Sequence, residues 1–138
     1  QPPPEPEYLA TILLVEDEAA VLQIGRDALQ SLGYNVIVAT APGEAIRQVE
    51  DETRAIDLVV TDLIMPEMDG RALAAQITAR RPGIQFLFLS GYPADYVAQR
   101  GVLDEGVHFL QKPYSLHELA IKVRSALNCE PPASAGDP

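Results

Sequence analysis

The chain has 138 residues, of which 20 are Asp or Glu and 10 are Lys or Arg, so its formal net charge is −10. Such an acidic chain lacks the basic clusters that neutralise phosphates, which argues against nucleic-acid binding by this domain. The single cysteine, Cys129, cannot form an internal disulfide, and no apolar run approaches the roughly 20 residues of a membrane span. We therefore expect one domain in a reducing, cytoplasmic setting that makes no membrane contact, although its parent protein could be membrane-attached.

The two ends of the chain differ in composition from the middle. Residues 1–8 and 130–138 hold seven of the twelve prolines and four acids but no bases, which leaves a net charge of −6 between them. A Pro/Glu-rich start is typical of a semi-stiff linker, and the last residues have a composition that favours disorder. We expect a linker over 1–8, a folded domain over 9–128 and a disordered tail over 129–138.

The first half of the folded stretch alternates apolar runs with amphipathic segments. An unbroken apolar run predicts a strand over residues 11–15 that is buried on both faces. Apolar residues near helical spacing then predict a helix over 18–32, which Gly33 ends as a C-cap glycine. Residues 35–39 are the second predicted strand, and residues 43–51 are a short predicted helix.

The second half continues this alternation. Residues 57–61 predict a third strand, and a turn over 66–70 leads into a predicted helix over 71–80. Two further strands are predicted over 85–89 and 107–110, and glycines between them interrupt any long helix there.

The last predicted helix has the clearest start. Ser115 and Glu118 form a capping box, and apolar residues as far as Leu127 mark one face. Five strands that alternate with helices predict an α/β fold with a parallel sheet covered on both faces. Ligands of such sheets bind beyond the carboxyl ends of the strands, so the residues that follow each strand are candidates for a site.

Polar residues follow four of the five predicted strands. Glu16 and Asp17 follow the first, Asp62 the third, Ser90 the fourth and Lys112 the fifth. Three neighbouring carboxylates repel one another unless a proton or a cation relieves them, and Mg²⁺ prefers such oxygen ligands together with phosphate oxygens. A lysine suits a phosphoryl oxygen, and an aspartate can attack phosphorus to form an acyl phosphate. The pattern indicates Mg²⁺-assisted phosphoryl transfer.

Four motifs, in this order and spacing, resemble the receiver domains of two-component response regulators: ILLVEDE (12–18), DLVVTDLIMPEMDG (57–70), FLSG (88–91) and FLQKP (109–113). The resemblance covers about residues 9–128. It implies a flavodoxin-like (βα)5 fold, a three-layer α/β sandwich whose five parallel strands have the order 2-1-3-4-5. It also implies phosphoryl transfer from a histidine kinase or a histidine phosphotransfer domain with Mg²⁺, for which Mn²⁺ could substitute.

The resemblance implies a role for each acidic site residue. Asp62 would be the phosphoacceptor and a metal ligand. Asp17 would be the main carboxylate ligand of Mg²⁺, and Glu16 would act largely through a water. The backbone carbonyl of Ile64 would be a further metal ligand.

The resemblance also implies roles for the remaining site residues. Lys112 would pair with the phosphoryl group, and its peptide bond to Pro113 would be cis. Ser90 would bind a phosphoryl oxygen, and Phe109 would swing inward behind it as the switch aromatic. Phosphorylation would change the face formed by the fourth helix, the fifth strand and the fifth helix. The domain could also form a homodimer.

Two other functions remain open at this point. A pseudo-receiver would bind partners without phosphorylation, although such domains typically lose the acceptor, an acid or the lysine. A Mg²⁺-dependent phosphatase of the haloacid-dehalogenase type would also use an aspartate nucleophile, but it places a second Asp where this chain has Ile64.

The parent protein is also open. The run 90–93 together with 108–114 looks like receivers attached to hybrid sensor histidine kinases, and a stand-alone regulator is the alternative. An isolated receiver would not be a conventional enzyme, because it promotes only its own phosphorylation and dephosphorylation.

Overall fold

The computed structural model describes residues 10–51, 53–65, 67–91 and 108–128. Up to residue 90, and again after residue 108, the described strands and helices alternate along the chain, as the sequence predicts. In chain order they are β1 (Thr11–Val15), α1 (Ala19–Ser31), β2 (Asn35–Ala39), α2 (Pro42–Glu50), β3 (Leu58–Asp62), α3 (Gly70–Arg80), β4 (Gln85–Ser90), β5 (Phe109–Gln111) and α5 (Leu116–Asn128). The linker predicted over 1–8, the tail over 129–138 and the segment between the last two strands lie outside these residues.

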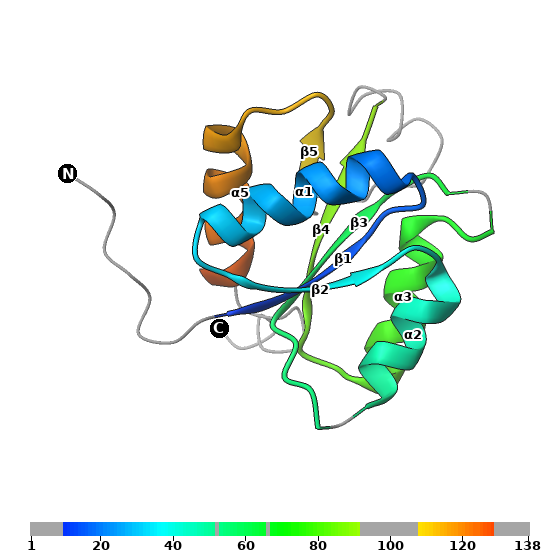
Figure 1. Ribbon diagram of the computed structural model, residues 1–138. Helices are drawn as coiled ribbons and strands as arrows, with labels where there is room; N and C mark the ends of the chain where they lie inside the picture. The colour runs from blue at the N-terminus through cyan, green and yellow to red at the C-terminus, as the bar shows by residue number, and fades with distance from the viewer. Residues whose placement is uncertain (1–9, 52, 66, 92–107, 129–138) are drawn as a thin grey trace, which may run out of the picture.

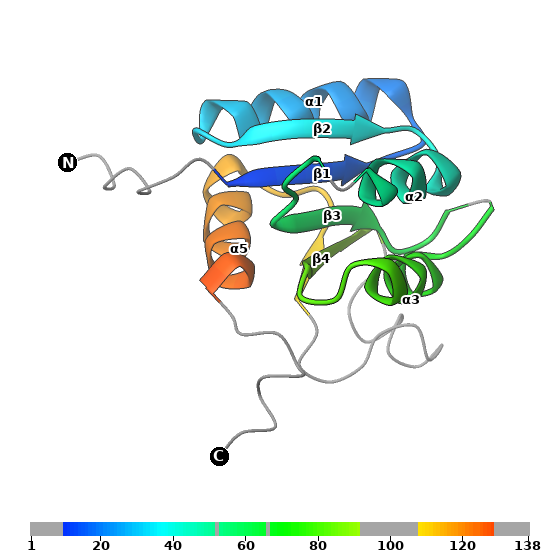
Figure 2. The same cartoon turned by 90° about the horizontal axis from the view of Figure 1, so that it is seen from below.

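The five strands form one parallel sheet in the order β2-β1-β3-β4-β5. Helices α1 and α5 cover one face of the sheet, and α2 and α3 lie side by side on the other (Figures 1 and 2). The arrangement is a three-layer, flavodoxin-like α/β sandwich, so the predicted fold class is confirmed. None of the described helices is long and apolar enough to cross a membrane.

Both faces of the sheet carry a hydrophobic core, which explains the unbroken apolar runs of the strands. In β1, Ile12 and Leu14 pack toward α1 and α5, whereas Leu13 and Val15 pack toward α2 and α3. Alternate side chains of a strand point to opposite faces, so a strand covered on both sides needs apolar residues at every position.

Two predicted helix-end signals act as the sequence indicates. Gly33 has φ +99°, and the next residue, Tyr34, donates its backbone N–H to the Leu29 carbonyl at 3.3 Å, which closes α1 in a Schellman motif. At the start of α5, Ser115 accepts from the Glu118 backbone N–H at 3.0 Å, and the Glu118 carboxylate accepts from the Ser115 N–H at 2.9 Å.

The strand boundaries differ by one or two residues from those predicted. Asp62 is the last residue of β3 and pairs with Leu89, and Ser90 is the last residue of β4 and pairs with Gln111. The apolar pattern stops where the polar residues begin, but the backbone pairing continues through them. These two polar residues therefore belong to the buried sheet rather than to the loops.

Gly70 begins α3 in close contact with the end of β3. Its N–H donates to the Leu63 carbonyl at 2.6 Å, and a Cβ at this position would lie 2.6 Å from the Asp62 carbonyl oxygen and 3.1 Å from the Phe88 ring. Because two of the nearest atoms are backbone, the contact cannot be relieved by a rotamer change.

We expect Gly70→Ala to destabilise the domain by roughly 1–3 kcal/mol through overpacking, although alanine is the better helix former. The matched control is Gly43→Ala in α2, where a Cβ would approach only the end of Arg47, at 3.9 Å. The control should be neutral or stabilising by up to about 1 kcal/mol. Urea denaturation measures both, and equal effects of the two substitutions would contradict the close contact at Gly70.

Candidate functional site

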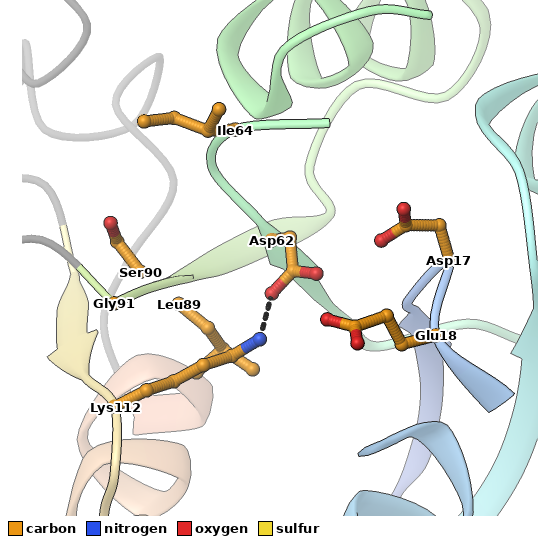
Figure 3. Close-up of a pocket in the computed structure, with 8 residues that line it drawn as sticks. All are labelled: Asp17, Glu18, Asp62, Ile64, Leu89, Ser90, Gly91 and Lys112. Carbon is orange, nitrogen blue, oxygen red and sulfur yellow. Dashed lines mark ion pairs between the residues drawn. The ribbon is translucent and has the colours of Figure 1, made fainter. Parts of the chain in front are cut away.

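An open cavity of about 260 Å³ lies at the carboxyl ends of the strands. Figure 3 shows it, with Lys112 and Ser90 on one side of Asp62 and two further acids on the other. The cavity is lined by Asp17, Glu18, Asp62, Ile64, Leu89, Ser90, Gly91 and Lys112.

Backbone hydrogen bonds just beyond the strands bring distant parts of the chain to this edge. The N–H of Glu16 donates to the Ala39 carbonyl at 3.1 Å, and the N–H of Lys112 donates to the Ser90 carbonyl at 2.7 Å. The parallel ladders thus extend into the loops that carry the site. The predicted convergence of Glu16, Asp17, Asp62, Ser90 and Lys112 at one edge therefore follows from the sheet itself.

Lys112 joins two buried carboxylates. Its Nζ lies 2.6 Å from Asp62 Oδ1 and 2.8 Å from Glu16 Oε1, and only the pairing with Glu16 is also a well-aligned hydrogen bond. Glu16 is 2% exposed and Asp62 is 6% exposed. Buried carboxylates need such a partner, because an unpaired charge loses its hydration without compensation.

The two carboxylates differ in their protonation. Burial, reinforced by the neighbouring Glu16, raises the pKa of Asp62 to about 7, despite the opposing effect of Lys112. Burial also acts to raise the pKa of Glu16, but hydrogen bonds with Asp62 and Lys112 outweigh it and lower that pKa. For Lys112, burial is likewise outweighed by the two acids, so its pKa is raised. Glu16 and Lys112 form the charged pair, and Asp62 is close to its titration point at neutral pH.

The acidic residues have a geometry suited to a divalent cation. One carboxylate oxygen each from Glu16, Asp17 and Asp62 lies within 4.8 Å of the other two. Asp17 is exposed at the cavity, whereas Glu16 is buried behind it and does not line the cavity. Three carboxylates against one ammonium leave excess negative charge, and hard oxygen donors fit Mg²⁺.

The other predicted site residues also lie around the cavity or behind it. Ser90 is 4% exposed and lines the cavity, as does Ile64 from the loop after β3. Phe109 is half-buried at the start of β5 and packs against the cluster of Leu63 and Phe88. The Lys112–Pro113 peptide bond is cis. The functions expected of these residues remain predictions.

One cavity residue, Glu18, was not singled out by the sequence. It directly follows the pair Glu16–Asp17, and an acid at the start of a helix is ordinarily a solvated residue that favours the helix dipole. The available signal was the third acid in the motif ILLVEDE, directly after the predicted metal ligands.

Comparison with known proteins identifies the class to which this site belongs. The response regulator receiver domain family matches residues 12–124. The chain belongs to the response regulator receiver domain family. It is thus a domain of two-component signalling. Receiver domains in general bind Mg²⁺, and the three carboxylates could hold such an ion.

Individual relatives support the same family and extend the comparison to hybrid kinases. The sensor kinase CckA of Brucella abortus is 45% identical over 118 residues, which are 86% of this chain and 12% of CckA. The regulatory protein GlrR of Escherichia coli is 36% identical over 129 residues, 91% of this chain and 28% of GlrR. The receiver domain of the hybrid histidine kinase CckA superposes with a TM-score of 0.72 and 34% identity, covering 86% of this chain and all of that one. The predicted likeness to hybrid-kinase receivers is confirmed, and the chain spans only a small part of these full-length relatives.

The raised pKa of Asp62 makes stability depend on pH in the absence of metal. The folded receiver domain holds this proton up to about pH 7, whereas the unfolded chain releases it near the ordinary value of 3.8. The stability due to protonated Asp62 is therefore fully present below pH 4 and is lost as the pH rises to 7.

Asn at position 62 cannot ionise. We accordingly expect the free energy of unfolding of Asp62→Asn, relative to that of the parent, to be higher at pH 8 than at pH 5. Urea denaturation in the presence of a chelator measures the difference at each pH. Asp27→Asn, an exposed site on α1, is the control and should show the same effect at both pH values. An Asp62→Asn effect that is equal at pH 5 and pH 8 would contradict the raised pKa.

Proposed function

We propose that this domain accepts a phosphoryl group on Asp62 from the phosphohistidine of a histidine kinase or a histidine phosphotransfer domain. The observation that carries the proposal is the buried Asp62 carboxylate at a cavity, 2.6 Å from an ammonium group and close to two further carboxylates. This arrangement combines a nucleophile, a partner for phosphoryl oxygens and oxygen donors for a cation in one place.

The transfer step makes one bond and breaks one. An oxygen of Asp62 attacks phosphorus in line, the phosphorus–nitrogen bond breaks, and its electron pair stays on the imidazole that leaves. Asp62 attacks as a carboxylate, so the proton that burial favours has to leave first. Lys112 then pairs with a phosphoryl oxygen, Ser90 donates its hydroxyl to another, and the exposed Gly91 leaves room for the group.

The metal site is proposed on the same residues. Asp17 and Asp62 would hold Mg²⁺ directly, Glu16 would act through a water, and the Ile64 carbonyl would complete the protein ligands. Mg²⁺, or Mn²⁺ in its place, supplies positive charge to the phosphoryl oxygens when bound. A cation there also favours the ionised form of Asp62, which is the nucleophile.

Ser90 and Phe109 would transmit the change at Asp62 to the surface of the domain. Phe109 is half-buried against the Leu63 and Phe88 cluster, so an inward movement has apolar side chains to pack against. The output face would include β5 and α5, where Leu116 and Ile121 are 49% and 54% exposed. Exposed apolar side chains on one helix suit a partner or a second copy of the domain. The fourth helix of this face lies outside the described residues.

The alternatives have less support. A pseudo-receiver needs no acceptor, yet the acceptor, the acids and the lysine are all present here and are in contact or within ligand distance of one another. The phosphatase alternative lacks its second Asp, because Ile64 occupies that position. For the parent protein we favour a hybrid sensor kinase, on the basis of the identity to CckA over 86% of this chain.

Phosphorylation at Asp62 is tested by Asp62→Asn. We expect uptake of phosphate from acetyl phosphate or from a phosphorylated histidine phosphotransfer domain to fall below detection, measured as an 80 Da mass increase by mass spectrometry. The control is Asp69→Asn at the N-cap of α3, where asparagine can still accept from the Ala72 N–H. Undiminished phosphorylation of Asp62→Asn would rule out the assignment.

Metal binding is tested separately with Asp17→Asn. The loss of an exposed carboxylate ligand should weaken Mn²⁺ binding by roughly tenfold or more, measured by electron paramagnetic resonance titration of the unphosphorylated protein. Asp27→Asn removes the same charge from α1 away from the cavity and should leave the affinity within about twofold. Equal affinities of the two variants would place the ion elsewhere.

A further inference from the structure

Glu18 is the third carboxylate in the lining of the cavity, together with Asp17 and Asp62. Its side chain extends toward Asp62 beside that of Asp17 (Figure 3). Glu18 is the N-cap residue of α1, yet its carboxylate caps no backbone N–H, and within the described residues it forms no ion pair or hydrogen bond. Its backbone N–H donates to Glu16 Oε2 at 3.3 Å, and its carbonyl accepts from the Leu22 N–H at 2.9 Å.

The position of Glu18 differs from that of the three carboxylates suited to a metal. It is exposed, and it is not part of the group whose oxygens lie within 4.8 Å of one another. The ammonium of Lys112 is occupied by Glu16 and Asp62 and does not neutralise it. Glu18 therefore adds a negative charge to the rim of the cavity, where its side chain is exposed to solvent.

The negative charge of Glu18 acts on the leaving group of the phosphodonor. In an in-line attack, the leaving group lies opposite Asp62 across phosphorus and therefore toward the opening of the cavity. An acyl phosphate expels a carboxylate, which carries away the electron pair of the broken oxygen–phosphorus bond as a negative charge. A phosphoimidazole protonated on its other ring nitrogen expels neutral imidazole, because the electron pair of the nitrogen–phosphorus bond cancels its positive charge.

We propose that Glu18 is a specificity-determining residue that favours phosphodonors with a positive charge beside the phosphoryl group, such as protonated phosphohistidine, over acyl phosphates. Its carboxylate attracts the protonated imidazole and repels a departing carboxylate. This proposal rests on the proposed phosphorylation of Asp62. Glu18 would thus discriminate between a protein phosphohistidine and small acyl phosphates, which carry the same phosphoryl group.

The test compares two small donors, acetyl phosphate and phosphoimidazole, on the whole domain at saturating Mg²⁺. In Glu18→Gln, the ratio of the acetyl phosphate rate constant to the phosphoimidazole rate constant should rise roughly two- to fivefold, as expected for removal of one partly solvated charge. The gain should shrink at high ionic strength, because the interaction is screened. Glu18→Asp should keep the parental ratio, and Asp27→Asn, with the same charge change further along α1, should not alter it.

The outcomes separate this proposal from the one on which it rests. An unchanged ratio in Glu18→Gln, with both donors active on the parent, overturns the role of Glu18 and leaves phosphorylation of Asp62 intact. A parent domain that neither donor phosphorylates overturns the proposed function itself. Mg²⁺ affinity is measured for each variant by calorimetry. If Glu18→Gln slows both donors equally and weakens Mg²⁺ binding, Glu18 serves the metal and the proposed selectivity is wrong.

Discussion

The site depends on one lysine that is shared by two buried acids. Lys112 contacts Glu16, which lies 96 positions earlier in the chain, and Asp62. Burial of either carboxylate without this ammonium would be strongly unfavourable, because both are almost completely withdrawn from water. The pairing thus connects the ends of β1, β3 and β5 at the edge where polar side chains follow the apolar runs of the strands.

The rest of the fold supplies the stability that this edge lacks. Two apolar clusters, one on each face of the sheet, hold the strands so that their carboxyl ends meet. These clusters stabilise the sheet without any contribution from the polar site residues. The site can therefore hold four carboxylates near one ammonium group. The raised pKa of Asp62 is the local consequence of its burial and of the neighbouring Glu16, and a proton or a cation relieves the excess of negative charge.

The periodicity of the sequence and the order of its strands were sufficient to predict a sheet covered on both faces and the edge that carries the site. Consecutive apolar residues in β1 and β3 imply two covered faces, and the polar residues that follow the apolar runs imply one common edge. The sequence could not reveal that Asp62 and Ser90 still belong to the ladders, because apolar patterns end before backbone pairing does. The contact of Gly70 with the Asp62 carbonyl, the shift of the Asp62 pKa and the inward direction of Glu18 all depend on tertiary distances. No local pattern encodes those distances.

The shared lysine also suggests how the proposed phosphorylation of Asp62 would affect β5. In the proposed acyl phosphate of Asp62, the attacking oxygen would be bonded to phosphorus and would no longer offer a full charge, while new negative oxygens would lie further out in the cavity. Lys112 would follow that charge, and its two present contacts would then not both keep their present lengths. Because Lys112 directly follows β5, which is only three residues long and lies at the edge of the sheet, the displacement falls on the least restrained strand. The interaction that makes the unphosphorylated site stable is thus the one through which phosphorylation would move β5.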